Sequence, residues 1–383
     1  MPTVIGQFND SFAPIADGVC NVVRNYAHWL NQKEYGRCCV ITPCFPGYND
    51  DEDFEVLRYR SVPVPLRRPY RAGIALFDPR FQKKIKGISF DIIHVHSPFS
   101  CGRLGLHIAR KLGIPVIATF HSKYYDDFVS ALKSPAAARL MLKNVMSFYS
   151  KADRVWTVSR SAVDTMREYG FRGDVQVVGN GTDICAVCAP RPSKSDILRL
   201  LYVGQLVWHK NLKLLVFALR LLKDSGTRFS ITVVGEGNAQ QGLKRLVQRL
   251  GLGGEFMFLG RIDDRDKLSQ IYSGADINLL PSVYDTFSIV VREAAALGCP
   301  SIVIKGSCAG EDITDGFNGF LCGDDIKEFA HAIQRAASDR SSLAAAGCNA
   351  RNTLFRSWES VVCEVAQRYS DVINEHKRHR LIH

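Results

Sequence analysis

The chain of 383 residues is 46% hydrophobic and 23% charged, and its formal net charge at pH 7 is +11. This length exceeds what one hydrophobic core usually supports, so we expect two domains, and the ordinary apolar share excludes an intrinsically disordered protein. No stretch of about 18 apolar residues predicts a membrane-spanning helix, and residues 1–12 lack the regions of a signal peptide, so we expect a cytosolic protein.

The sequence contains twelve cysteines, which could indicate disulfides or a metal site. Most of them lie in apolar contexts, such as Cys38 and Cys39 in RCCVITP, and this placement is typical of buried thiols in a reducing compartment. Cys185 and Cys188 form a single CxxC without the second pair that a zinc site needs. We therefore expect no metal and no other cofactor.

The first half alternates short β-branched or apolar runs with amphipathic segments. Strands are expected at residues 2–8, 38–43, 91–97, 115–121 and 154–159, with helices that include 19–32 and 104–113. This alternation favours parallel α/β layers. Within the loop 9–19, which leads from the first strand into a helix, Gly18 would let the backbone approach a ligand, and the helix N-terminus would favour an anion.

Residues 58–86 carry nine basic side chains against one acid, Asp78, with Tyr59, Tyr70, Phe77 and Phe81 among them. One interpretation is a solvated loop and helix face. Another is a patch at a membrane surface, where basic residues meet anionic head groups and aromatic rings lie beneath them. No motif supports a nucleic-acid interface. The candidate patch for a membrane or acceptor comprises Arg67, Arg68, Arg71, Lys83 and Lys84.

Three histidines follow or lie in the expected strands. His94 and His96 alternate along one strand, but no third ligand is evident, so a structural role is favoured over a metal pair. His121 comes at the end of the next strand. A histidine in that position is most often a structural hydrogen-bonding group.

A polar, proline-containing stretch at 185–196 predicts an interdomain linker. We place the domains at 1–187 and 188–356, and expect 357–383 to form a long charged helix that crosses back to the first domain. In the second half, strands are expected at 198–206, 231–237, 256–262, 277–282 and 301–306. The predicted fold is α/β, with two Rossmann-like domains facing across a cleft, where ligands bind at strand ends.

The segment PSVYDTFSIVVREAAALGCP, residues 281–300, is the most informative part of the chain. Asp285 and Glu293 stand eight positions apart, in what is predicted to be the opening of a helix, with Thr286 or Ser288 as N-cap and Gly298 near its end. If the interval is helical, the carboxylates lie about 10 Å apart along one wall. That spacing suits the hexose and ribose of a nucleotide-diphosphate sugar, with the diphosphate at the helix N-terminus.

This segment resembles the donor-site signature of retaining GT-B glycosyltransferases of family 4 (glycosyl transferases group 1), in which two acidic residues flank seven others. Asp285 replaces the usual Glu. The loop 9–19 is similar to the DSYxPxxxGV opening of that class, and His121 matches its histidine near the reaction centre. Residues 180–183 match its NGxD turn, and the turn at Gly235 resembles its VGxGP turn.

The resemblance assigns site residues. Lys210 would meet the diphosphate, Glu293 the ribose and Asp285 the transferred sugar, while Gln205 stands where the family has Arg. The implied catalytic residues are His121, Lys210 and Asp285. The implied donor-binding residues are Gly18, Gln205, Lys210, Gly235, Asp285, Thr286, Phe287, Ser288 and Glu293.

The resemblance implies transfer of a hexose, with retention, from a nucleotide-diphosphate sugar, expected to be a UDP-sugar. TFHSKYYDDF at 119–128 resembles the corresponding loop of diacylglycerol glucosyltransferases, so we expect a glycolipid or cell-envelope acceptor and peripheral contact with an anionic membrane. Three alternatives stay open: a soluble acceptor such as an aminocyclitol or glycoside, a non-catalytic nucleotide-sugar binder, and a sugar epimerase. A dehydrogenase is rejected because the first loop lacks Gly-x-Gly-x-x-Gly.

Overall fold

The computed structural model describes residues 2–15, 17–65, 67–184 and 196–382. The chain divides into two compact units, Met1–Asn180 with Trp358–His383, and Gly181–Ser357. The boundary therefore falls at 180/181, not at the expected 187/188. Apart from Asp196, the expected linker and the CxxC at 185–188 lie outside the described residues.

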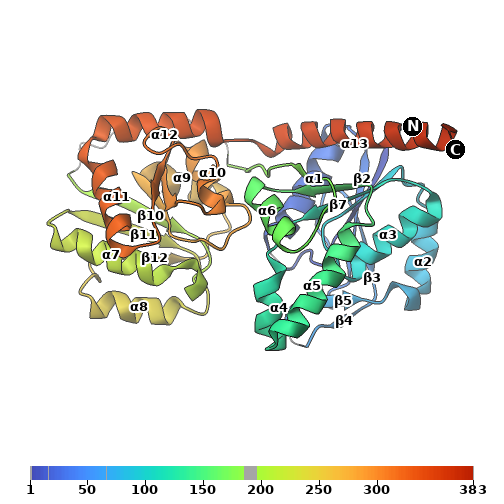
Figure 1. Ribbon diagram of the computed structural model, residues 1–383, viewed down its shortest axis with the longest axis horizontal. Helices are drawn as coiled ribbons and strands as arrows, with labels where there is room; N and C mark the ends of the chain where they lie inside the picture. Colours follow the sequence, from blue (N-terminus) through green and yellow to red (C-terminus); the bar gives the residue numbers. More distant parts are fainter. Residues whose placement is uncertain (1, 16, 66, 185–195, 383) are drawn as a thin grey trace. The chain divides into compact units, whose positions relative to one another are not determined.

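Within the described part of the first unit, a seven-stranded parallel sheet has the order β3-β2-β1-β6-β7-β8-β9 (Figure 1). Gln7 of β1 lies beside His94 of β6, so side chains far apart in sequence share one row of the sheet. A short antiparallel hairpin, β4-β5, is separate. The strands are β1 (Val4–Phe8), β2 (Arg37–Pro43), β3 (Glu55–Tyr59), β4 (Ser61–Pro63), β5 (Arg71–Gly73), β6 (Ile92–Val95), β7 (Val116–Phe120), β8 (Arg154–Thr157) and β9 (Gln176–Val177).

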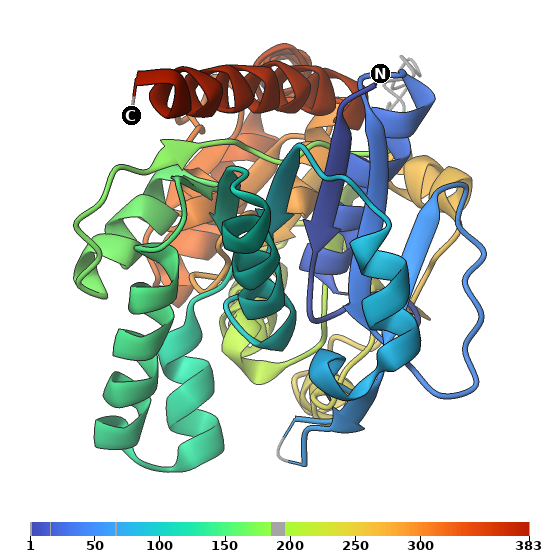
Figure 2. The ribbon, with the colours of Figure 1, turned by 90° about the vertical axis from the view of Figure 1, so that its right-hand side faces the viewer.

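Helices cover both faces of this sheet. One core lies between the sheet and α1 and α13, and includes Tyr26, Trp358 and Tyr369. The other lies against α3 and α5 and includes Phe120 and Phe148. Figure 2 shows α13, in dark red, on the side of the sheet opposite α3 and α5. The helical segments are α1 (Gly18–Gln32), η1 (Ala75–Phe77), α2 (Pro79–Lys86), α3 (Ser100–Leu112), α4 (Tyr124–Leu132), α5 (Pro135–Tyr149), α6 (Arg160–Glu168) and α13 (Trp358–Ile382).

Two aspartates of the β1–α1 loop fix helix starts. Asp17 is the N-cap of α1 and accepts a hydrogen bond from the Cys20 backbone N–H at 2.8 Å. Phe99 occupies the N-cap position of α3, but its side chain makes no capping hydrogen bond. Asp10 of the β1–α1 loop takes this role and accepts from the Cys101 N–H at 2.9 Å. Burial raises the pKa of Asp10, and hydrogen bonds from Ser100 and Ser97 oppose that rise. The loop is thereby held against the start of α3.

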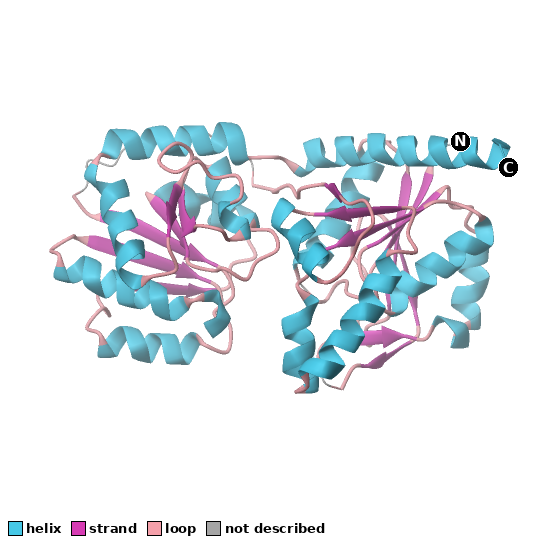
Figure 3. Ribbon diagram, viewed as in Figure 1, coloured by secondary structure: helices cyan, strands magenta, loops and turns pink. Residues whose placement is uncertain are grey.

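In the second unit, the described residues form a six-stranded parallel sheet of order β12-β11-β10-β13-β14-β15. Figure 3 shows its helices on both faces; α7, α8 and α11 pack on one core, and α9, α10 and α12 on the other side. The elements are β10 (Leu198–Val203), η2 (Trp208–Lys210), α7 (Leu212–Asp224), β11 (Phe229–Val234), α8 (Gln240–Arg249), β12 (Phe256–Gly260), α9 (Arg265–Gly274), β13 (Ile277–Leu280), α10 (Ile289–Ala296), β14 (Ser301–Ile304), η3 (Cys308–Gly310), β15 (Phe320–Cys322), α11 (Ile326–Ser338) and α12 (Arg340–Leu354).

The basic segment 58–86 forms β3, the hairpin, η1 and α2, and it corrects one expectation. Tyr59 and Phe81 are only 1% and 2% exposed and their rings pack at 4.9 Å, so they belong to the core and not to an interfacial patch. Phe77, by contrast, is 71% exposed. Across the described residues, no helix is both long and apolar enough to cross a membrane.

Candidate active site

The helix of the segment 281–300 begins only after the first of the two acids. Ser288 occupies the N-cap position of α10, Leu297 the C-cap, and Gly298 follows with φ +65°. These are the expected start and stop. Asp285 lies in the loop before the helix, so only the second half of the interval to Glu293 is helical. The estimate of about 10 Å assumed a helix throughout.

The hydroxyl of Ser288 is the least expected feature of this helix start. Ser288 is 7% exposed, yet its Oγ has no hydrogen-bond partner among the residues that the structure describes. Leaving a buried hydroxyl unpaired costs roughly 1–3 kcal/mol. The first backbone N–H groups of a helix also lack intrahelical partners and favour an anion. The start of α10 therefore has the donors that an oxygen-rich anion requires.

Asp285, in the loop just before this helix start, forms an ion pair with Lys210. The ammonium group of Lys210, at the end of η2, contacts Asp285 Oδ1, and their side chains are only 17% and 21% exposed. Gln205, on the same β10–η2 loop, is exposed, and its carbonyl accepts from the Tyr202 hydroxyl at 3.1 Å. The structure thus joins the two predicted charged residues directly.

Glu293 is buried and already paired, which the sequence did not indicate. Its carboxylate accepts from Arg265 Nη1 and from the Tyr272 hydroxyl, both at 2.9 Å. Arg265 also reaches Asp183 of the NGxD turn at 3.3 Å. Burial raises the pKa of Glu293, and the Arg265 charge opposes that rise. Arg265 and Tyr272 were missed because neither belongs to a recognisable local pattern.

Other predicted donor residues have structural partners of their own. Gly235 has φ +132°, and a Cβ there would lie 1.9 Å from the Gly204 carbonyl oxygen, so the contact between two loops at the strand ends requires glycine. The Thr286 carbonyl accepts from the Cys308 thiol at 2.8 Å. The Phe287 ring lies 5.4 Å from the Arg292 guanidinium.

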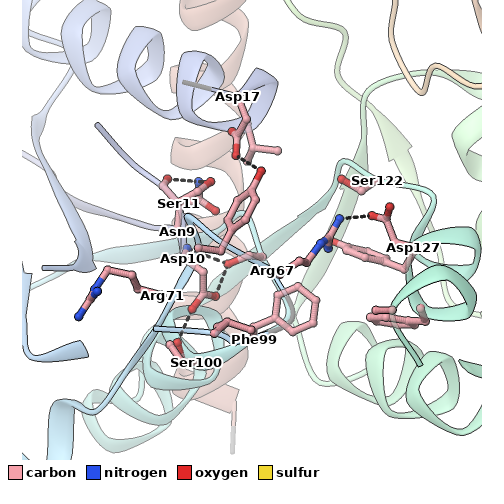
Figure 4. Close-up of a pocket in the computed structure, with 18 of the residues that line it drawn as sticks. Asn9, Asp10, Ser11, Asp17, Arg67, Arg71, Phe99, Ser100, Ser122 and Asp127 are labelled. Carbon is pink, nitrogen blue, oxygen red and sulfur yellow. Dashed lines mark hydrogen bonds and ion pairs between the residues drawn. The ribbon is translucent and has the colours of Figure 1, made fainter. Parts of the chain in front are cut away.

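The first unit contains a cavity of about 410 Å³. Its walls come from the β1–α1 loop, the β4–β5 hairpin, the start of α3, and α4 and α5. The polar contacts there include the ion pair of Arg67 Nη2 with Asp127 Oδ2 at 2.6 Å (Figure 4). The Tyr70 hydroxyl also donates to Asp17 at 3.2 Å. The apolar lining residues are Val19, Val64, Ala72, Phe99, Phe128, Ala131, Leu132 and Met141.

The five residues of the predicted basic patch do not form one group. Arg67 and Arg71 line the cavity, and the Arg71 guanidinium is bound to Ser61 Oγ at 2.7 Å and to its carbonyl oxygen at 2.9 Å. Arg68, Lys83 and Lys84 are exposed to solvent.

Gly18 and His121 lie at the N-terminal end of α1 and the C-terminal end of β7. A Cβ at Gly18 would meet no atom within 4 Å, so packing does not require glycine there. His121 is 7% exposed, and burial lowers its pKa to about 3. Its Nε2 lies 3.0 Å from His96 Nδ1. In the described chain, no group of three or more His, Cys, Asp or Glu side chains could hold a metal ion.

Comparison with known proteins matches both halves of the chain to one class of enzyme. Residues 16–185 match the family Glycosyltransferase Family 4, and residues 190–353 match Glycosyl transferases group 1. The chain is 25% identical to the alpha-monoglucosyldiacylglycerol synthase of Streptococcus pneumoniae, covering 83% of this chain and 74% of that protein. It is 24% identical to a GDP-mannose-dependent alpha-mannosyltransferase of Corynebacterium glutamicum, covering 97% and 90%.

A solved structure shares the fold. Anabaena Alr3699/HepE in complex with UDP superposes with a TM-score of 0.76 at 18% identity, covering 96% of this chain and all of that chain. The two family matches together span most of the chain, as the motifs predicted. The protein is therefore a glycosyltransferase with the GT-B fold and belongs to the group 1 (family 4) glycosyltransferases.

Proposed function

We propose that this glycosyltransferase moves a hexose from a UDP-sugar, with retention at the anomeric carbon, to a hydroxyl group of a glycolipid or cell-envelope precursor. The observation that carries the donor part is the unpaired, buried Ser288 hydroxyl at the start of α10. Phosphate oxygens would satisfy this hydroxyl and the adjacent helix N–H groups.

Lys210 supplies the positive charge that a departing diphosphate needs. Its ammonium group is held by Asp285, which leaves further N–H donors for phosphate oxygens, since an ammonium group has three. Fixed donors aimed at developing negative charge lower the barrier to bond cleavage. Lys210 and the α10 N-terminus would thus do what a divalent cation does elsewhere, and we expect EDTA to leave the rate unchanged.

The names of two relatives support the proposal of retention. The S. pneumoniae and C. glutamicum relatives are named for alpha-linked products. UDP-glucose and GDP-mannose are α-linked donors, so an α-linked product retains the anomeric configuration. UDP is bound in the Anabaena structure, whereas the mannosyltransferase uses GDP-mannose, so the two nucleotides are the donors to compare.

The acceptor proposal rests on the cavity of the first unit. Its walls are mainly apolar, with the Arg67–Asp127 ion pair and the Tyr70–Asp17 hydrogen bond among them. Such a lining suits an acceptor with an apolar portion next to hydroxyl groups. A diacylglycerol glycolipid has this character, and the S. pneumoniae relative is named for one. A small soluble glycoside or aminocyclitol is the second candidate, since polar groups reach the same cavity.

Peripheral membrane contact fits the exposed side of the basic segment. Leu76 and Phe77 are 83% and 71% exposed. Arg80, Lys83 and Lys84, which lie in the adjoining helix α2, are exposed as well. Apolar side chains beside basic ones favour the surface of an anionic membrane.

The test is a nucleotide-release assay with matched donors and acceptors. UDP-glucose, UDP-galactose and GDP-mannose are each incubated with diacylglycerol, a monoglucosyldiacylglycerol, a soluble alkyl glucoside or an aminocyclitol. We expect UDP release from one UDP-sugar, stimulated by a lipid acceptor and unaffected by EDTA. The anomeric proton coupling of the product, measured by NMR, reports retention.

Each alternative gives a different result in this assay. Release only with the soluble glycoside or aminocyclitol would replace the lipid acceptor, and release only from GDP-mannose would replace the donor. Conversion of the nucleotide sugar without any acceptor would indicate an epimerase. Binding of a nucleotide sugar without release under any condition would indicate a non-catalytic binder, which the changes at Gln205 and Asp285 would then explain.

A further inference from the structure

His121 is attached to a buried network of side chains that we call the histidine relay. Its members come from β1, from β6 and β7 with the residues just after them, and from α13. Each is at most 7% exposed. The relay consists of Gln7, His94, His96, Thr119, His121 and Tyr369.

Burial keeps the three imidazole rings neutral at pH 7. It lowers the pKa of His94 and His96 well below the ordinary value, and that of His121 to about 3. A neutral imidazole has one nitrogen that donates a hydrogen bond and one that accepts. The partner of one ring nitrogen therefore decides what the other nitrogen can do.

The amide of Gln7 sets the direction of the network. Its Nε2 donates to the Tyr369 hydroxyl at 2.9 Å, so its Oε1 faces His96 Nε2 at 2.7 Å. A carbonyl oxygen can only accept. His96 must therefore carry its proton on Nε2, and its Nδ1 is left as an acceptor.

That acceptor fixes the tautomer of His121. His96 Nδ1 lies 3.0 Å from His121 Nε2, and since His96 Nδ1 carries no proton, His121 Nε2 must donate. The proton of His121 therefore lies on Nε2. Its Nδ1 is the accepting nitrogen of the ring.

Tyr369 holds Gln7 in the orientation on which this depends. Its hydroxyl accepts from Gln7 Nε2 and lies 2.6 Å from His94 Nδ1, and His94 Nε2 lies 2.6 Å from Thr119 Oγ1. The Tyr369 ring is stacked on Trp156, with centroids 5.8 Å apart and an interplanar angle of 7°. Turning the Gln7 amide over would reverse the bonds that run from Tyr369 through Gln7 and His96 to His121.

We propose that Gln7, His96 and Tyr369 are positioning residues that hold His121 as the Nε2–H tautomer. His121 then accepts a hydrogen bond at Nδ1 and donates none there, which selects a hydroxyl or N–H group as its contact. The part of this proposal that concerns turnover rests on the proposed function, because His121 acts in transfer only if the enzyme transfers a sugar. The tautomer itself does not depend on it.

The first test is ¹⁵N NMR of the full chain labelled at histidine, without substrate, at neutral pH. We expect His96 and His121 both to show a protonated Nε2 and an unprotonated Nδ1, with assignments from His96→Gln and His121→Gln spectra. Nδ1–H tautomers at both residues would overturn the proposal, because they require the reversed orientation of Gln7.

The second test uses variants that loosen the direction of the relay. Tyr369→Phe keeps the ring and removes only the hydroxyl that holds Gln7, and Gln7→Leu removes the amide. Both should convert part of the His121 population to the Nδ1–H tautomer. Tyr59→Phe, another buried tyrosine of the first unit outside the relay, is the control and should change neither spectrum nor turnover. An unchanged His121 tautomer in Tyr369→Phe, when that variant is folded, would overturn the role of Tyr369.

Kinetics then separate positioning from general loss of structure. We expect kcat to fall in proportion to the fraction of His121 that leaves the Nε2–H form, so that an equal mixture halves kcat, while the donor KM is unchanged. A kcat independent of that fraction would overturn the link to turnover. If the wild-type enzyme transfers no sugar at all, the proposed function fails, and the NMR result still decides the tautomer.

Discussion

Lys210 and Asp285 carry opposite charges, and the proposed function assigns them to different parts of one ligand. They contact each other in the second unit, and both are mostly buried. Under the proposed function, Lys210 meets the diphosphate, which UDP alone already contains. Asp285 meets the hydroxyls of the hexose, which UDP lacks.

Lys210→Gln and Asp285→Asn should therefore differ in what they bind. We expect Lys210→Gln to weaken both UDP and UDP-sugar by roughly ten- to hundredfold, since hydrogen bonds to charged groups contribute about 1.5–3 kcal/mol. Asp285→Asn should keep or improve UDP affinity, because it frees Lys210 from its partner, and should weaken only the nucleotide sugar. Isothermal titration with UDP and with the active UDP-sugar measures both. Equal losses for the two ligands in Asp285→Asn would contradict the assignment.

At this scale the sequence identified the residues that belong to motifs and missed their partners. Glu293 and Lys210 were identified because each lies in a short segment that resembles a motif of the family. Arg265 and Tyr272, which bind the Glu293 carboxylate, lie 28 and 21 positions away from it. Only packing of α9 against α10 brings them together.

At the scale of elements, the segment from η1 to α2 separates into a buried and an exposed side. Phe81 and Ile85 of α2 stand four residues apart and face the core, as one face of a helix does. Leu76, Phe77 and the lysines of α2 remain exposed. The charge count along the sequence could not distinguish Phe77 from Phe81, because both lie among the same basic residues.

Two double variants test this segment as a membrane contact. We expect Lys83→Ser/Lys84→Ser to weaken sedimentation with anionic vesicles by roughly fivefold per lysine, with the difference vanishing at high salt. Leu76→Ser/Phe77→Ser should weaken it at every salt concentration, because apolar burial is not screened. Arg245→Ser/Lys305→Ser, exposed in the second unit, is the charge-matched control. If that control weakens binding as much as the lysine pair does, general charge and not this segment is responsible.

At the scale of the whole molecule, the buried histidines should limit stability in acid. The folded pKa of His94, His96 and His121 lies below the ordinary 6.5, so the unfolded chain takes up protons first as the pH falls. The contribution of these histidines to the free energy of unfolding of the first unit is thus fully present above pH 6.5. It decreases below that pH, by up to about 1.4 kcal/mol per pH unit for each histidine. Asp10 has the opposite effect, because its raised pKa makes the folded state bind its proton first.

Urea unfolding between about pH 7.5 and pH 5.5 measures this loss. His94→Gln should show a smaller decrease than the wild type, by about one histidine's share. Trp29, Trp156 and Trp358 lie in the first unit, so a Trp208→Phe background restricts the fluorescence signal to that unit. The same decrease in both proteins would show that His94 does not titrate as expected.

The sequence alone determined the α/β class and the family, and it located the motifs that the proposed function assigns to the donor. Strand and helix periodicity and motif spacing are local properties, readable within about 20 residues. The tertiary structure decided which side chains meet: Tyr369 with Gln7, 362 positions apart, and Asp10 with the start of α3. Hydrophobic pattern specifies that a residue is buried but not its partner, because partners are set by strand order and by which helix covers each face of the sheet.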